Sequence, residues 1–134
     1  MKKITLAILC MILVACAGSN TTEEKTSLTP AEFDQQSKTT ADAILIDVRT
    51  AEEIQSGYIK GAINMDFNRP EFKILIAGMD KTKPYFVYCL SGKRSGKAAD
   101  FMREQGFEHV KTLEGGMNAW NAAGLPAVTP SPAP

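Results

Sequence analysis

One cysteine stands where a thiol could be activated as a nucleophile. Cys89 follows a short apolar run, residues 85–88, and precedes a loop with one glycine and two basic residues. A helix is expected to begin at about Ser95, so this loop would lead from a strand end to a helix start. The N–H groups and partial positive charge of a helix N-terminus, together with nearby cations, favour an ionised thiol. A cysteine in such surroundings has a lowered pKa and acts as a nucleophile.

The loop after Cys89 could also hold a small anion. Successive backbone N–H groups of a strand-to-helix loop can point inward and form an anion-binding nest. Gly92 permits a turn that a side chain would disfavour, and Lys93 and Arg94 add full positive charge. We therefore expect Cys89 to be catalytic and the loop to bind substrate. The expected binding residues are Leu90, Ser91, Gly92, Lys93, Arg94 and Ser95.

Two other interpretations of Cys89 were weighed. Phosphatases use a Cys, five residues and an Arg, whereas here Arg94 follows after only four and Ser95 occupies the phosphatase position. This shorter loop disfavours a phosphatase or an arsenate reductase. Free cysteines are also among the most buried residues, so Cys89 could be an inert core residue. Its place between an apolar run and a Gly-Lys-Arg loop favours the reactive interpretation.

Strands and helices alternate along the chain and predict a mainly parallel sheet with helices on both faces. In such sheets, sites form beyond the carboxyl ends of the strands, which is where Cys89 is expected. Two helix starts have clear capping signals, Thr29-Pro30 and the Thr50/Glu53 pair. The expected strands are 43–48, 62–64, 85–88 and 109–112, and the expected helices are 30–37, 50–54, 70–77, 95–105 and 116–123.

Three sequence blocks resemble the signatures of rhodanese domains. Residues 89–95, CLSGKRS, resemble the active-site loop Cys-x-x-Gly-x-Arg-Ser, and residues 46–64 and 113–120 resemble the first and closing signatures. The resemblance implies an α/β fold with a five-stranded, mainly parallel sheet. It implies a sulfurtransferase without a cofactor, in which Cys89 takes sulfane sulfur from a donor such as thiosulfate and passes it from a persulfide to a thiol or cyanide. Lys93 and Arg94 would attract the anionic donor.

The same resemblance implies that Ser95 caps the helix. Asp47, Arg49 and Glu53 could be catalytic, but ion pairs usually serve structure, so we expect these residues to form a structural network at a strand end. Two positions depart from the usual pattern: Tyr58 replaces a His, and Leu90 replaces a polar residue. Leu90 makes the mouth of the site more apolar, which bears on the identity of the donor. The alternative function is a non-turnover sulfur carrier or binding module of the cell envelope.

The N-terminus has the pattern of a secretory signal, with a basic start, an apolar run over residues 4–14 and a small residue before a cysteine. Residues 13–16, LVAC, resemble the lipobox of bacterial lipoproteins. That resemblance implies cleavage before Cys16 and diacylglycerol on its sulfur, although an ordinary signal or a short uncleaved anchor stays an alternative. Because Ala17 is not Asp, we expect the periplasmic face of the outer membrane rather than the inner membrane in a didermal organism.

The expected organisation has four parts: signal peptide 1–15, lipidated Cys and flexible tether 16–28, rhodanese-like domain 29–125, and disordered Pro-rich tail 126–134. The chain has 15 basic and 15 acidic residues, and loss of Lys2 and Lys3 on cleavage leaves 13 against 15. No basic stripe then remains to attract nucleic acid. One His and one free thiol cannot make a standard zinc site. We expect a monomer with no metal and no cofactor.

Overall fold

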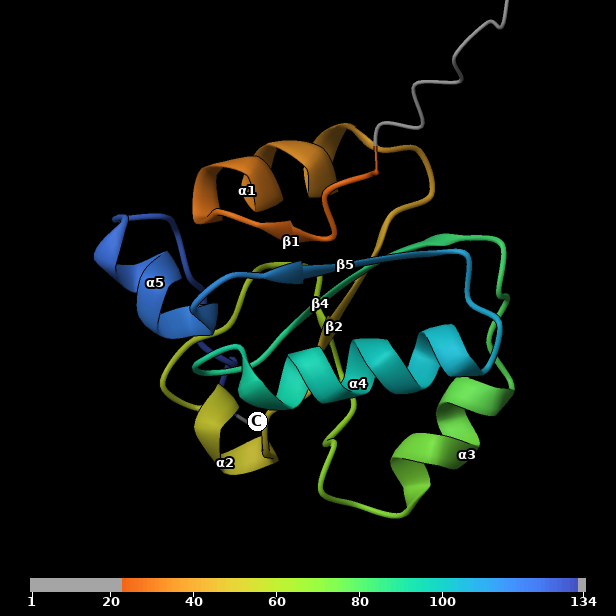
Figure 1. Ribbon diagram of the computed structural model, residues 1–134. Helices are drawn as coiled ribbons and strands as arrows, with labels where there is room; N and C mark the ends of the chain where they lie inside the picture. The colour runs from red at the N-terminus through yellow and green to blue at the C-terminus, as the bar shows by residue number, and fades with distance from the viewer. Residues whose placement is uncertain (1–22, 133–134) are drawn as a thin grey trace, which may run out of the picture.

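Five parallel strands form one sheet in the order β1-β5-β4-β2-β3 in the computed structural model, which describes residues 23–132 (Figure 1). The strands are β1 (Ser27–Leu28), β2 (Ile44–Asp47), β3 (Ile63–Asn64), β4 (Pro84–Tyr88) and β5 (His109–Leu113). The helices are α1 (Pro30–Thr39), α2 (Ala51–Ile54), α3 (Glu71–Ala77), α4 (Lys93–Glu104) and α5 (Gly116–Ala122). The predicted α/β class with a parallel sheet is confirmed.

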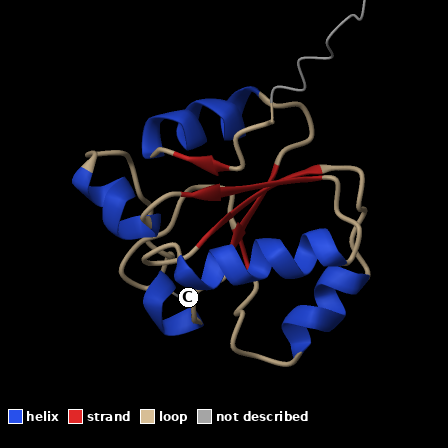
Figure 2. Cartoon of the chain, viewed as in Figure 1, coloured by secondary structure: helices blue, strands red, loops and turns tan. Residues whose placement is uncertain are grey.

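The central strand β4 sends alternate side chains to two separate cores. Tyr85 and Val87 join Cys89 in a cluster with buried residues of α3 and α4. Phe86 and Tyr88 join the other cluster, with buried residues of α1 and α5. This period-two pattern follows from the strand geometry, and it explains why the 85–88 run is apolar throughout. Helices cover both faces of the sheet as predicted (Figure 2), and Cys89 lies on the α4 side.

The first turns of α1 and α2 are each closed by a capping box. In α2 the Thr50 hydroxyl accepts from the Glu53 N–H at 3.2 Å, and the Glu53 carboxylate accepts from the Thr50 N–H at 2.9 Å. Thr29 and Glu32 make the same arrangement in α1. Each box satisfies backbone donors that a helix start leaves free. It therefore fixes Glu53, whose carboxylate also reaches the loop after Cys89.

Residues 27 and 28, which we expected to belong to the flexible tether, form β1 instead. Ser27 pairs with Thr112 and Leu28 with Leu113, so β1 covers the edge of β5. Leu28 is only 1% exposed and packs in the cluster that contains Phe33. The preceding residues are polar, which favoured a tether. One large apolar side chain and an open strand edge are enough to bring the end of this segment into the sheet.

Part of the tail that we expected to be disordered is held against the domain. Tyr58 and Val128 exchange two backbone hydrogen bonds of 2.9 Å. The indole N–H of Trp120 donates to the carbonyl oxygen of Pro126 at 3.1 Å. Prolines prevent this segment from continuing a helix or a full ladder, but their carbonyl groups still accept. A Pro-rich composition therefore predicts the absence of helix and sheet in this segment, but it does not predict whether the backbone is held in one position.

The signal peptide, the lipobox and most of the expected tether lie outside the described residues. Within residues 23–132, no helix has both the length and the apolar composition needed to cross a bilayer.

If β1 is part of the fold, Leu28→Ala will destabilise the protein. Loss of this buried side chain is expected to lower the free energy of unfolding by about 3 kcal/mol, the usual cost of a buried Leu-to-Ala change. The measurement is urea unfolding of the chain from Ala17 onward, which keeps every described residue. Ile74→Ala is the control, because Ile74 is 73% exposed. Equal stability of the two variants would show that residue 28 belongs to a tether.

Candidate active site

The Cys89 sulfur lies at the N-terminus of α4, beyond the carboxyl end of β4. Its Sγ accepts hydrogen bonds from the backbone N–H groups of Gly92 at 3.1 Å and Ser95 at 3.4 Å. The Ser95 hydroxyl oxygen lies 3.4 Å from the same sulfur. Cys89 is fully buried, with 0% of its surface exposed. The loop therefore surrounds the sulfur with donors and keeps water away from it.

The helix begins two residues earlier than the sequence predicted. Gly92, with φ of 95° in the left-handed region, is the residue before the first turn, and α4 starts at Lys93. The prediction that Ser95 caps the helix was therefore wrong. Ser95 lies inside the first turn, where its hydroxyl donates to the Gly92 carbonyl oxygen at 3.2 Å and its N–H points at the sulfur. The left-handed turn at Gly92 makes this early start possible.

Opposing effects act on the ionisation of Cys89. Burial alone would raise the pKa of the thiol. Hydrogen bonds outweigh burial: those from the Ser95 hydroxyl, the Ser95 N–H and the N–H groups of Gly92 and Ser91 together hold the Cys89 pKa below its ordinary value. These donors are fixed by the loop and the helix start before any substrate arrives. The thiolate is thus stabilised mainly by neutral backbone and hydroxyl groups.

The start of α5 binds the backbone of the loop through two hydrogen bonds. The N–H of Met117 donates to the Cys89 carbonyl oxygen at 2.9 Å, and the N–H of Asn118 donates to that of Leu90 at 3.0 Å. Gly116 makes this approach possible, because a Cβ there would lie 2.4 Å from the Cys89 oxygen and 2.6 Å from the Leu90 carbonyl. The sequence predicted a helix from residue 116 but did not lead us to expect this approach to the loop. Glycines directly before a helix were the available signal of a close backbone approach.

A buried network supports the strand end beside Cys89. The Arg49 guanidinium, 2% exposed, donates to the Asp47 carboxylate at 2.7–3.1 Å and to the Gly57 carbonyl oxygen at 2.7 Å. It lies 5.8 Å from the ring centre of Tyr88, whose hydroxyl accepts from the Ile59 N–H at 3.0 Å. Burial raises the pKa of Tyr88, so it stays protonated. The predicted structural role of Asp47 and Arg49 agrees with this geometry.

The two cations at the start of α4, Lys93 and Arg94, have different surroundings. Arg94 forms a two-pronged ion pair with Glu53 of α2, with N–O distances of 2.7 and 2.8 Å. A hydrogen bond from Arg94, helped by one from the Thr50 N–H, lowers the pKa of Glu53 to about 2. Lys93 is exposed and makes no ion pair with the residues that the structure describes. Leu90, 38% exposed, lies at the surface of the loop.

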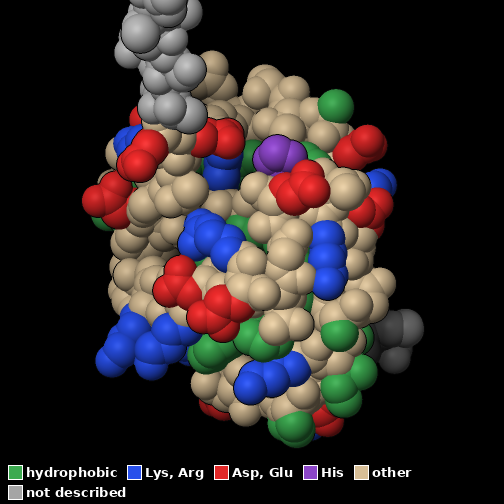
Figure 3. All heavy atoms as spheres, turned by 45° about the vertical axis from the view of Figure 1, so that its right-hand side comes forward, with side chains coloured by type: hydrophobic (Ala, Val, Ile, Leu, Met, Phe, Trp, Pro, Cys, Tyr) green, Lys and Arg blue, Asp and Glu red, His purple; other side chains and the backbone are tan. Residues whose placement is uncertain are grey.

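Two surface pockets are placed differently relative to Cys89. The larger one, about 410 Å³, lies at the start of β4 and β5, the opposite end of the sheet from Cys89, and His109 contributes to its lining. Figure 3 shows the histidine at the surface beside acidic side chains, and its Nε2 lies 3.8 Å from the Glu108 carboxylate. The other, a groove of about 370 Å³, runs from α2 past the end of β3 to α3. Its lining residues are Ala51, Asn64, Met65, Asp66, Arg69, Glu71, Phe72 and Leu75.

Residues 23–132 contain no group of three or more His, Cys, Asp or Glu side chains placed to hold a metal ion. The chemistry that the site offers is that of a buried cysteine whose thiol pKa is lowered by the hydrogen-bond donors around it.

Ser95→Ala is expected to raise the pKa of Cys89, because one hydroxyl hydrogen bond to the ionised sulfur is lost. The rate of alkylation by iodoacetamide against pH measures this pKa, and its midpoint should move to higher pH. Ser91→Ala is the matched control, since Ser91 acts on the sulfur through its backbone N–H alone. Equal midpoints for wild type and Ser95→Ala would show that the hydroxyl does not stabilise the thiolate.

Gly116→Ala is expected to displace the loop, since its Cβ would overlap the backbone of residues 89 and 90. Alkylation of Cys89 at neutral pH should slow by at least about tenfold, as the donors lose their alignment with the sulfur. Gly124→Ala is the control, because Gly124 also has a positive φ, 70°, but a Cβ there meets nothing within 4 Å. If Gly116→Ala and Gly124→Ala slowed the alkylation of Cys89 by the same small factor, the effect would come from backbone strain and not from displacement of the loop.

Comparison with known proteins agrees with this geometry. Residues 29–123 match the rhodanese-like domain family. A sulfurtransferase of Allochromatium vinosum is 36% identical over 91 residues, 68% of this chain and 83% of that protein. Thiosulfate sulfurtransferase PspE of Escherichia coli is 37% identical over 70 residues, 52% of this chain and 67% of that protein. The polysulfide-sulfur transferase homodimer of Wolinella succinogenes aligns with a TM-score of 0.66 at 32% identity over 81% of each chain. This chain therefore belongs to the rhodanese-like domain family.

Proposed function

We propose that this protein is a rhodanese-type sulfurtransferase that carries sulfane sulfur as a persulfide on Cys89. The observation that carries the proposal is the pair of backbone N–H groups, from Gly92 and Ser95, directed at the Cys89 sulfur. Donors fixed in this way stabilise negative charge on sulfur before and after transfer. The names of the relatives, sulfurtransferase and thiosulfate sulfurtransferase, support the same class of reaction.

The reaction consists of two displacements at sulfur. In the first, the Cys89 thiolate attacks the outer sulfur of thiosulfate, a new S–S bond forms, the old one breaks, and sulfite leaves with the electron pair. In the second, a thiolate or cyanide attacks the outer sulfur of the persulfide. The Cys89 thiolate then leaves, and the product is a new persulfide or thiocyanate. Neither step needs a cofactor, because each displacement conserves electrons.

Each part of the loop has a task in this mechanism. The backbone of residues 90–95 surrounds the outer sulfur. The Ser95 hydroxyl, which lies 3.4 Å from Sγ and donates to the Gly92 carbonyl oxygen in this structure, turns to donate to the ionised sulfur during transfer. Lys93, exposed at the first turn of α4, draws an anionic donor toward the loop. Arg94 acts through its pair with Glu53, which ties the loop to α2. These assignments follow from position and chemistry alone.

Intact mass spectrometry of the chain from Ala17 onward, before and after thiosulfate, tests the persulfide. We expect a gain of about one sulfur, roughly 32 Da, which cyanide removes with release of thiocyanate. Cys89→Ser is the matched control and should gain nothing. The alternative is a sulfur carrier or binding module without turnover, which the full burial of Cys89 in the described domain keeps open. Loading without catalytic turnover would favour it, and no loading from any sulfane donor would refute the persulfide.

We also propose that the protein is exported and held to the cell envelope by lipid on Cys16, with the outer membrane as its site in a didermal organism. The support is the basic start, the apolar run and the LVAC sequence that ends at this residue. Two or more acyl chains on one cysteine give stable anchoring where one would not.

Radiolabelled palmitate supplied to cells that produce the full chain tests this anchor. Wild type should become labelled and fractionate with membranes, while Cys16→Ser should be unlabelled and keep its signal peptide. Cys10→Ser is the control and should behave as wild type, because residue 10 lies inside the apolar run. Wild-type protein that carries no radiolabel and stays in the soluble fraction would contradict the lipid anchor.

A further inference from the structure

The C-terminal segment lies across two elements that support the Cys89 loop. The Trp120 indole N–H donates to the Pro126 carbonyl oxygen at 3.1 Å, which fixes the segment to α5. Val128 exchanges two backbone hydrogen bonds of 2.9 Å with Tyr58, in the connection between α2 and β3. Figure 1 shows the last described part of the chain next to α2. Residues 125–130, here called the C-terminal strap, therefore join α5 to the α2–β3 connection.

The residues on both sides of Tyr58 bind buried side chains near the ends of β2 and β4. The Gly57 carbonyl oxygen accepts from the Arg49 guanidinium at 2.7 Å, and the Ile59 N–H donates to the Tyr88 hydroxyl at 3.0 Å. Gly57 and Ile59 thus bond toward the core, whereas Tyr58 bonds toward the strap. The connection is held from inside by two side chains and from outside by the strap.

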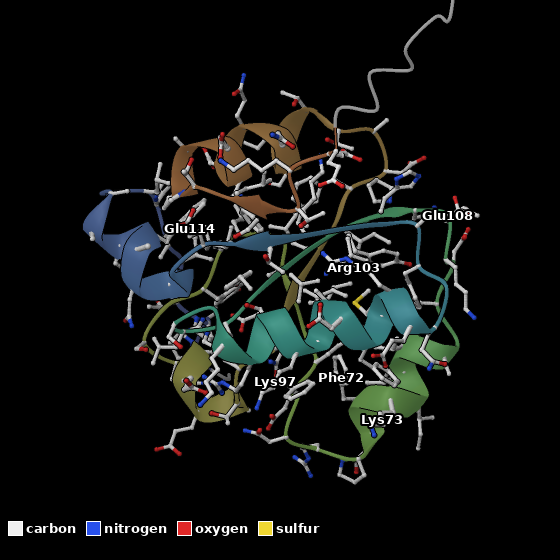
Figure 4. All side chains as sticks on the ribbon, in the orientation of Figure 1. Phe72, Lys73, Lys97, Arg103, Glu108 and Glu114 are labelled. Carbon is white, nitrogen blue, oxygen red and sulfur yellow. The ribbon has the colours of Figure 1, made fainter. Side chains whose placement is uncertain are left out.

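The other support, α5, contacts both the loop and the strap. Its first turn donates backbone N–H groups to the carbonyl oxygens of Cys89 and Leu90, at 2.9 and 3.0 Å. Figure 4 shows Glu114 at the turn from β5 into this helix. Trp120, on the same helix, is 1% exposed and carries the N–H group that holds Pro126. A displacement of α5 would therefore be passed to the Cys89 loop through these backbone bonds.

We propose that the C-terminal strap is a positioning element for Cys89. It keeps α5 and the α2–β3 connection at a fixed spacing, and these two supports keep the end of β4 aligned with the N–H groups at the start of α4. The hydrogen bonds of the strap go to Trp120 and Tyr58, and within the described part of the chain none reaches the cysteine. Pro126 and Pro130 lower the conformational entropy that is lost when the strap is fixed. This role goes beyond sulfur transfer and does not depend on it.

Two-dimensional ¹H–¹⁵N spectra of Val128→Pro, in the chain from Ala17 onward, test this coupling. Proline has no N–H, so the variant loses one of the two bonds to Tyr58. The expected response is an upfield shift of the amide protons whose hydrogen bonds lengthen and weaken. These are the amide protons of Ile59, Gly92 and Ser95. Ser131→Pro, which adds a proline beyond the bridge, is the matched control and should leave all three in place.

A general loss of stability gives a different result. Phe107 is buried and packs on Tyr85 at the start of β4, the end of the strand away from the reactive loop. Chemical shifts report the folded state, so Phe107→Leu should lower stability without moving the amide protons of Gly92 and Ser95. In the proline variant, a shift confined to Ile59 would show that the strap only covers the surface. That result, or no shift at any of the three amides, would overturn the proposal.

Hydrogen exchange of the wild-type chain supplies a second test that needs no substitution. If the strap holds the connection, opening of the Val128 bridge releases Ile59. The two amides should then exchange within about tenfold of each other after correction for their intrinsic rates. Exchange at Val128 that is faster by more than this factor would show that the connection stays in place without the strap, and would overturn the proposal even if Val128→Pro does not fold. Neither measurement uses a sulfur donor, so failure of the persulfide function would not alter them.

Discussion

The contacts around Cys89 meet one physical requirement: negative charge on its buried sulfur must be stabilised without water. Burial of Cys89 opposes ionisation, so the loop must supply hydrogen bonds in its place. These come from the loop and the first turn of α4, whose backbone N–H groups have no partners within the helix. Their direction is set by where β4 ends, by the left-handed turn at Gly92 and by the contact of α5 with the loop. Much of the domain thus serves to fix a few N–H groups.

Charged side chains near the site mostly hold the framework. Asp47 and Arg49 form a buried pair that ties the end of β2 to the Gly57 carbonyl. Arg94 and Glu53 tie the loop to α2. Ion pairs used in this way fix geometry even where their net contribution to stability is small. Consequently the charge available to a substrate is less than the loop sequence indicates, and neutral donors carry most of the stabilisation of the sulfur.

The sequence predicted what depends on local signals and missed what depends on contacts between distant segments. Capping pairs and alternating elements are local, and they predicted the starts of α1 and α2 and the class of the sheet. The Cys89 loop is also local, and its role as the nucleophile stays a prediction. The pairing of Arg94 with Glu53 joins residues 41 positions apart, and the role of Gly116 depends on a loop far back in the chain. Leu28 and the Tyr58–Val128 bridge were missed for the same reason. Polar or proline-rich composition describes a segment alone and says nothing about the surface it meets.

The central claim is that backbone N–H groups at the start of α4 hold the transferred sulfur. Two-dimensional ¹H–¹⁵N spectra of the chain from Ala17 onward, recorded before and after persulfidation of Cys89, test it most directly. The account predicts that the amide protons of Ser91, Gly92 and Ser95 move downfield on persulfidation, as hydrogen bonds to charged sulfur shorten, while those of β1 stay in place. Unchanged amide shifts at these three residues, with movement at Lys93 or Leu90 alone, would place the outer sulfur outside the loop and contradict the account.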